Sequence, residues 1–421
     1  MSMFDSAGAL LALIAVFGYI NHRFIKLPDT LGITAVGLIA FVGLSLFGLA
    51  HPEMALKAQT LVEQIDFSDL VFHGLLSLLL FAGALHVDLS KMRQFKLPVF
   101  LLATVGVVIS AVVVGAGFYY VAQLFGHSIS FLWCLVFGAL ISPTDPIAVL
   151  AVLKNAGASE NVETKITGEA LFNDGTAVVA FLTLVGLASG ATEFSAGQVS
   201  LTLLREVLGA AALGVIVGYT ASFMLRGLDS YPVEILTTLA LATGGYSLAE
   251  VLHVSAPLAV VVMGLVIGNH GAAKNMTEKT REHLFSFWGL LDELLNLVLF
   301  GLIGLEVIAL SFKLTDFWLG LVAIPVVLVA RYLSVATPMT ILRQFRELSP
   351  HAVKIMTWGG LRGGISIALA LSLPAFEGRD MIIGVTYVVV IFSLLVQATT
   401  LGPLVKRLNR SGQAPAAQTK S

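Results

Sequence analysis

The segment Ser142-Pro143-Thr144-Asp145-Pro146 places two prolines and an aspartate inside an apolar stretch that runs from about residue 131 to 153. Proline has no amide proton and pushes the residue before it out of the helical conformation, so we expect the helix to be interrupted here. The interruption leaves Asp145 in unwound backbone and the Thr144 carbonyl without a helical partner. An acid and free carbonyl oxygens can coordinate a monovalent cation. The alternative is a structural kink in which Asp145 caps the following half-helix.

A second helix-breaking segment, Gly359-Gly360-Leu361-Arg362-Gly363-Gly364, lies in the apolar stretch 352–374. The two segments occupy equivalent positions if the chain consists of two six-span repeats, at about 6–188 and 232–405, linked by one span at 199–224. A single linking span inverts the second repeat relative to the first. Inverted repeats with broken helices at equivalent positions are typical of secondary transporters. Unrelated kinks, which membrane helices tolerate, are the alternative.

The composition indicates that these stretches lie in a membrane. Hydrophobic residues make up 57% of the 421 residues and charged residues only 12%, with a mean hydropathy of +0.92. Soluble domains carry roughly 25% charged residues, so a soluble enzyme and a disordered chain are excluded. The single cysteine, Cys134, excludes a disulfide-stapled fold. The net charge of -2 leaves no basic surface for nucleic acid.

The span length predicts an all-α integral membrane protein, because a helix needs roughly 20 apolar residues to cross a bilayer. We predict about thirteen spans, two of them broken and crossing each other. They cover residues 6–22, 29–49, 70–88, 97–125, 131–153, 164–188, 199–224, 232–250, 255–269, 285–310, 316–342, 352–374 and 380–405. Residues 1–410 form a single transmembrane unit, and residues 411–421 are expected to be a disordered cytoplasmic tail.

Lysine and arginine are distributed unequally between the two sides of this predicted topology. Most of the 24 lie in loops after odd-numbered spans or at the C-terminus. The opposite side holds only Lys57, Arg205, Lys313 and Arg379. The positive-inside rule therefore predicts an external N-terminus and a cytoplasmic C-terminus. The short loops are typical of a protein of the bacterial inner membrane.

The span after the first interruption carries Glu169, Asn173 and Asp174. A charged side chain at the centre of a span costs roughly 2.5–3.5 kcal/mol, so Asp174 is a functional candidate. A carboxylate that titrates near neutral pH can hold a proton or a cation but not both, and this competition couples the two flows. The neutral Asn173 leaves one titrating group in the pair, which predicts an electroneutral exchange of one proton per cation. A purely structural interhelical hydrogen bond is the alternative for Asn173.

Two arginines, Arg331 and Arg362, lie inside predicted spans, where an unpaired arginine is costly. We predict an ion pair between Glu169 and Arg362 that fixes the sixth span against the broken twelfth span. Arg331 is expected to meet another buried acid or an exposed carbonyl. Glu306 and Asp292 are both possible partners, and the sequence does not choose between them.

Three motifs occur in a fixed order along the chain: Ser142–Pro146, the Glu-Ala-Leu-Phe-Asn-Asp-Gly-Thr segment 169–176, and the Trp-Gly-Gly-Leu-Arg-Gly-Gly-Ile-Ser segment 358–366. With these motifs the chain resembles the NhaP-type sodium/proton exchangers of the first cation/proton antiporter family, over about residues 6–405. The resemblance implies a thirteen-helix homodimer with a dimerisation domain and a moving core domain.

The resemblance also implies roles for individual residues of the ion site. Asp174 corresponds to the carboxylate shared by Na⁺ and H⁺, and Asn173 to the neutral neighbour of the electroneutral branch. Thr144, through its backbone oxygen, and Asp145 correspond to further Na⁺ ligands. Ala170 departs from the pattern, because archaeal members place a serine ligand at this position.

Supporting residues follow from the same resemblance. Glu169 and Arg362 match the core-stabilising pair of the family, and Arg331 matches an arginine that is important there. Some members place an acid near the end of the third span, and Asp88 is the nearest candidate in this chain.

Other classes of protein are less consistent with the sequence. A metalloprotease needs a His-Glu-x-x-His motif, which is absent. A channel uses rings of repeated filter elements, and a cation-driven symporter needs a larger polar pocket. We therefore expect a non-enzymatic antiporter that exchanges Na⁺, and also Li⁺, for H⁺ by alternating access and without a cofactor. Its expected partners are monovalent cations, protons, the lipid bilayer and a second copy of the chain.

Overall fold

The computed structural model describes residues 3–50, 53, 70–190, 196–272, 276–306, 314–343 and 351–413. Within these ranges the regular secondary structure is entirely helical. Eight of the described helices are long and apolar enough to cross a membrane, and shorter apolar helices accompany them. The predicted fold class, an all-α membrane protein with two broken helices, is confirmed, whereas the number of thirteen spans stays a prediction.

The helices of the first half follow the predicted spans. They are α1 (Met3–Ile20), α2 (Asp29–Ala50), α5 (Leu76–Leu85), α6 (Leu89–Met92), α7 (Lys96–Ala103), α8 (Val105–Leu124), α9 (Phe131–Leu140), α10 (Pro146–Ala156) and α11 (Glu160–Ala188). The helices α9 and α10 are the two halves of the predicted span 131–153. Pro146 begins α10, as expected for a residue that has no N–H to contribute to a helix.

The second half contains the predicted linking span, α12 (Ala196–Met224), and the helices that follow it. These are α13 (Tyr231–Val251), α14 (Ala256–Val266), α16 (Glu278–Glu306), α17 (Leu314–Arg343), α18 (Ala352–Trp358), α19 (Gly364–Leu371), α20 (Arg379–Phe392) and α21 (Ala398–Gln413). The halves of the second broken span are α18 and α19. A π-helical turn, Ser393–Gln397, joins α20 to α21. Because α21 extends to Gln413, the predicted tail begins within a helix, and residues 414–421 lie outside the described part of the chain.

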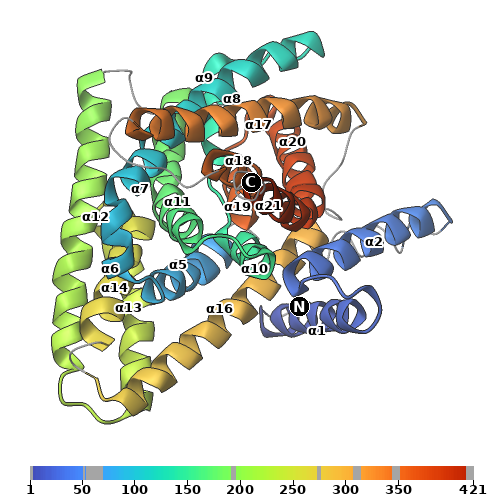
Figure 1. Cartoon of the computed structure of the whole chain (residues 1–421). Helices are drawn as coiled ribbons and strands as arrows, with labels where there is room; N and C mark the ends of the chain where they lie inside the picture. Colours follow the sequence, from blue (N-terminus) through green and yellow to red (C-terminus); the bar gives the residue numbers. More distant parts are fainter. Residues whose placement is uncertain are drawn as a thin grey trace, which may run out of the picture.

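The long helix α16 organises the arrangement in space. In Figure 1 it runs diagonally between the group of α12, α13 and α14 and the pair of α1 and α2. It packs on α2, α5 and α13 along its length. The broken helices lie together with α11, and α20 packs against α19. Both interruptions are thus enclosed by helices on several sides.

Glycines allow the helices to approach closely. A Cβ atom on Gly138 of α9 would overlap the carbonyl oxygen of Ala111 in α8. At the contact of α2 with α16, a Cβ on Gly37 would lie 2.9 Å from the Cα of Gly304. Such small-residue contacts let dispersion forces act between backbones, which is how helices associate where lipid removes the hydrophobic driving force.

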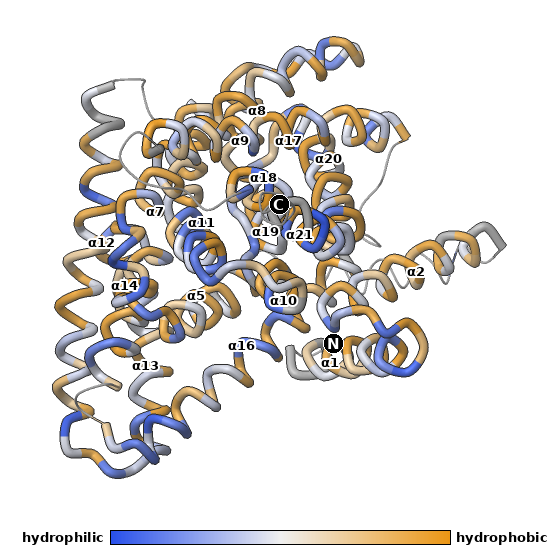
Figure 2. Tube along the Cα trace, in the orientation of Figure 1, coloured by the Kyte–Doolittle hydropathy of each residue, from blue (hydrophilic) through white to orange (hydrophobic). Residues whose placement is uncertain are grey.

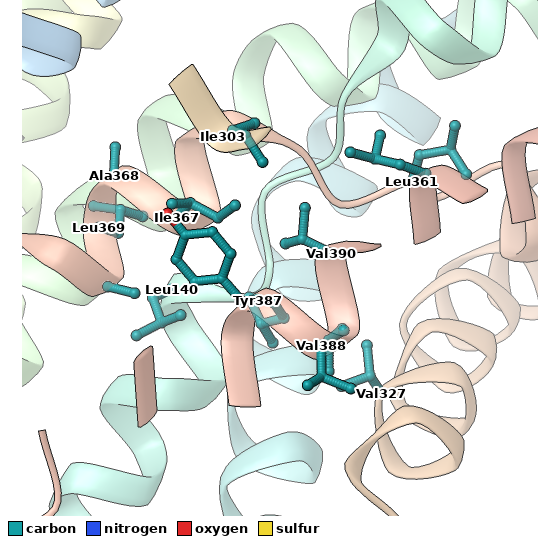
Figure 3. Packing of buried hydrophobic residues seen from close by; sticks show 14 of the residues in the cluster. Leu140, Ile303, Val327, Leu361, Ile367, Ala368, Leu369, Tyr387, Val388 and Val390 are labelled. Carbon is teal, nitrogen blue, oxygen red and sulfur yellow. The ribbon is translucent and has the colours of Figure 1, made fainter. Parts of the chain in front are cut away.

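The polarity of the surface fits a lipid environment. Large hydrophobic side chains of α12 project outward, among them Leu201, Ile216 and Phe223, each at least 65% exposed. Figure 2 shows hydrophilic residues gathered where the chain connects α12 to α13 and where α16 begins. Inside, Tyr387 of α20 lies beside Ile367 of α19, with Leu140 of α9 nearby (Figure 3). An apolar exterior of this extent requires lipid rather than water around the helices.

Candidate ion-binding site

Asp174 and Asn173 lie in the middle of α11, next to the first unwound segment. Their side chains are buried, at 5% and 1% exposure. Asn173 Nδ2 donates a hydrogen bond of 2.8 Å to Thr144 Oγ1. Asp174 lines the same cavity as Thr144 and Asp145. The structure therefore brings together Asp174, Asn173, Thr144 and Asp145, the four residues that the sequence predicts as the ion site.

The two unwound segments contact each other at several points, one of which is a backbone hydrogen bond. The backbone N–H of Asp145 donates to the Leu361 carbonyl oxygen at 2.8 Å. The Asp145 side chain rests against Gly363, where an added Cβ would lie 2.7 Å from its Oδ2. A glycine is required at this position because the carboxylate occupies the space of a side chain. The second motif thus holds the first in place through backbone contacts.

Arg362 binds backbone carbonyls rather than an acid. Its Nη1 donates to the carbonyl oxygens of Ser142 and Pro143, the latter at 3.0 Å. These carbonyls follow the C-terminal end of α9, where helix geometry leaves acceptors unpaired and the helix dipole is negative. A guanidinium group compensates both effects. The sequence prediction that Arg362 forms the ion pair with Glu169 is therefore wrong.

The partner of Glu169 is Arg331 of α17. Arg331 Nη1 and Nη2 donate to the two carboxylate oxygens, the second contact measuring 3.0 Å, and both residues are buried. Arg331 also donates from Nε and Nη2 to the Met356 carbonyl oxygen, at 3.3 and 3.2 Å, near the C-terminal end of α18. The partners considered for Arg331 from the sequence, Asp292 and Glu306, do not include the residue found. The side chain of Glu306 lies outside the described part of the structure.

A cavity of about 640 Å³ leads to the site. Thr144, Asp145 and Asp174 line its inner part, together with Asp292 and Asn296 of α16. Exposed residues surround its mouth, namely His86, Asp88, Lys91, Lys154 and Glu160. Within the described residues no group of three or more His, Cys, Asp and Glu side chains could hold a metal ion. The inner part of the cavity is lined by carboxylate, hydroxyl and amide oxygens of the residues named above.

Asp88 lies at the rim of this cavity and acts as a helix cap. Its Oδ1 accepts hydrogen bonds from the backbone N–H of Ser90, at 2.8 Å, and of Lys91, at 3.4 Å. The Ser90 hydroxyl group, which also donates to Oδ1, lowers the pKa of this carboxyl group. These donors satisfy Oδ1, so Asp88 stabilises the start of α6 as its N-cap. Ala170 is buried beside Glu169 and contributes no ligand.

The sequence analysis considered Asp292 as a possible partner of Arg331 and did not consider Asn296, although both residues line the cavity. Asn296 Nδ2 donates to the Asp292 carbonyl oxygen at 2.7 Å and to its Oδ1 at 3.2 Å. The signal available in the sequence was a polar pair with i, i+4 spacing, which places both side chains on one helix face. No motif accompanies the pair, so only the packing of α16 reveals which way that face points.

Comparisons of the sequence with known proteins identify the family of the chain. Residues 11–407 match the family described as sodium/hydrogen exchanger, transmembrane. The chain is 46% identical to the Na⁺/H⁺ antiporter NhaP of Pseudomonas aeruginosa, covering 96% of this chain and 97% of that protein. It is 36% identical to NhaH of Halobacillus aidingensis, covering 95% and 96%.

Among solved structures, the sodium proton antiporter MjNhaP1 of Methanocaldococcus jannaschii at pH 8 shares the fold. The TM-score is 0.76 at 19% identity, and the match covers 97% of this chain and 99% of that one. The profile match over nearly the whole membrane region and the 46% identical relative both point to one assignment. The chain therefore belongs to the sodium/hydrogen exchanger family and is an NhaP-type exchanger of the first cation/proton antiporter family.

Proposed function

We propose that the protein exchanges Na⁺, and also Li⁺, for H⁺, with the two ions competing for Asp174. One observation supports this above all. Asp174 is 5% exposed and lines the cavity, yet its Oδ1 has no hydrogen-bond partner among the described residues. A proton or a cation would stabilise a buried carboxylate oxygen that accepts no hydrogen bond from the protein, because an uncompensated buried charge is strongly destabilised. Thr144 and Asp145 supply further oxygens within reach of the same cavity.

The contacts of Asn173 support an exchange of one cation for one proton. Its amide is held by Thr144 and carries no charge, so Asp174 is the titrating member of the pair. If one carboxylate releases one proton for each Na⁺ bound, no net charge crosses the membrane. Where the carboxylate is mostly protonated, the half-saturating Na⁺ concentration then rises about tenfold for each unit by which the pH falls, because the carboxylate must be deprotonated to bind Na⁺.

The residues at the mouth of the cavity suggest the side of the membrane to which the ion site is open. Lys91 and Lys154, at its mouth, belong to the loops that the positive-inside rule assigns to the cytoplasm. We therefore propose that the ion site is open to the cytoplasm in this conformation, with the N-terminus outside, in the bacterial inner membrane. In the proposed alternating access, the domain that contains the two unwound segments moves relative to the rest of the protein. We propose that two copies of the chain form a homodimer. The relatives are transporters, and we propose no enzymatic activity.

The test measures Na⁺-driven proton flux in everted vesicles and in proteoliposomes. Added Na⁺ should dissipate an imposed pH gradient, and Asp174→Ala should abolish the response. The matched control is Glu160→Gln, which removes an acid at the cavity mouth that pairs with Lys91 on the exposed surface. Full exchange by Asp174→Ala would refute the proposal. Flux that depends strongly on a clamped membrane potential would contradict the one-for-one stoichiometry.

A further inference from the structure

The second unwound segment, between α18 and α19, is supported by α20, α21 and the π-helical turn that joins them. Ser393 and Gln397, the first and last residues of that turn, are buried and point at the unwound segment. Gln397 Nε2 donates to the Trp358 carbonyl oxygen at 3.2 Å. The Arg362 backbone N–H donates to Ser393 Oγ at 2.8 Å. Isolated π-helical turns occur mostly within longer α-helices and frequently at functional sites.

The contact made by Ser393 reaches the ion site through one peptide group. The Arg362 N–H and the Leu361 C=O belong to the same peptide unit, which is planar and trans, so the two groups point in opposite directions. On one side the N–H is held by Ser393 Oγ, and on the other side the C=O accepts the Asp145 N–H at 2.8 Å. Fixing one end of this rigid plane therefore fixes the direction of the other.

We propose that Ser393 is a positioning residue for cation binding, acting on Asp145 through the Leu361–Arg362 peptide. Ser393 touches neither the cavity nor the carboxylates, so its effect is indirect. Without the hydroxyl group, the buried Arg362 N–H loses its acceptor and the peptide plane is free to rotate. The Asp145 backbone then loses its defined acceptor, and the first unwound segment shifts relative to Asp174. The proposal rests on the proposed function of the Asp174 site.

The experiment compares Ser393→Ala with Ser393→Thr, which retains the Oγ acceptor. The matched control is Thr386→Val in α20, because the buried Thr386 hydroxyl group donates to the Ile382 carbonyl oxygen of its own helix and has no bond to another helix among the described residues. Na⁺-driven proton flux is measured in proteoliposomes at one pH. We expect Ser393→Ala to raise the half-saturating Na⁺ concentration about three- to tenfold, the range for one lost hydrogen bond. The maximal rate should change less, and Ser393→Thr and Thr386→Val should match the wild type.

Several outcomes would overturn the proposal. They are an unchanged half-saturating concentration in Ser393→Ala, an equal rise in Thr386→Val, or a fall in maximal rate alone. The last outcome would indicate a merely structural role. If Ser393→Ala does not insert or fold, Ser393→Cys, with its weaker sulfur acceptor, should show a smaller rise in the same direction, and no rise would again overturn the proposal.

A second measurement separates binding from turnover. Bound Na⁺ stabilises the folded state by RT ln(1 + c/Kd), where c is the Na⁺ concentration, so the concentration at which thermal unfolding in detergent begins to shift reports the dissociation constant. That concentration should rise in Ser393→Ala by the same factor as in the flux assay. Each series of flux measurements on the Ser393 variants includes proteoliposomes with the wild-type protein and with Asp174→Ala. Absence of exchange in the wild type would refute the proposed function, whereas normal exchange with an unaffected Ser393→Ala would refute only the role of Ser393.

Discussion

The Glu169–Arg331 pair can be tested by its effect on the free energy of unfolding. The variants Glu169→Gln and Arg331→Met each remove one charge at nearly constant volume. Removing one partner of a buried ion pair costs about 3–5 kcal/mol, because the remaining charge is left uncompensated. Arg331→Met should be the more damaging change, since Arg331 also donates to the Met356 carbonyl oxygen, which then loses its donor. In Glu169→Gln the guanidinium group keeps that contact.

The double variant distinguishes this pair from the predicted one. Once either charge is gone, loss of the other adds little, so Glu169→Gln with Arg331→Met should show a coupling energy above about 1.5 kcal/mol. The matched cycle with Arg362→Met should give a clearly smaller coupling, since Arg362 binds the Ser142 and Pro143 carbonyls. The assay is reversible unfolding in mixed micelles, followed by circular dichroism. Additive losses for Glu169 and Arg331, or stronger coupling with Arg362, would refute the reasoning.

Three further predictions follow from the site and the packing. Asp88→Asn should leave the half-saturating Na⁺ concentration in proteoliposomes unchanged, because asparagine caps a helix equally well; a rise of threefold or more would make Asp88 part of the ion path. Asn173→Asp should make Na⁺-driven flux sensitive to a clamped membrane potential by adding a second acid beside Asp174, and voltage-independent flux would contradict this. Gly138→Ala should destabilise by about 1–3 kcal/mol through overlap with α8. Gly8→Ala, which meets nothing within 4 Å, is its control in thermal unfolding, and equal stability of the two would refute the packing argument.

The sequence alone determined much of this protein, including the placement of the apolar helices and the two interruptions. Prolines and clustered glycines act on the backbone within one or two residues, so their effect can be predicted without the fold. The proximity of Asn173 to Thr144 was expected only from the family resemblance, and the structure shows it as a hydrogen bond between their side chains. The family assignment also followed from three local motifs in order.

The tertiary structure alone decided which buried arginine meets Glu169. Helix periodicity gives the face on which Glu169 lies, but Arg362 lies in an unwound segment, where no periodicity fixes the direction of its side chain. Its guanidinium group donates to carbonyl oxygens at the end of α9. The Glu169 carboxylate is bound instead by Arg331, which lies more than 150 residues away in the chain. The contact between Ser393 and the Arg362 N–H could not be predicted from the sequence for the same reason. Pairing across helices depends on tilt and rotation, which long-range packing sets and the local sequence does not contain.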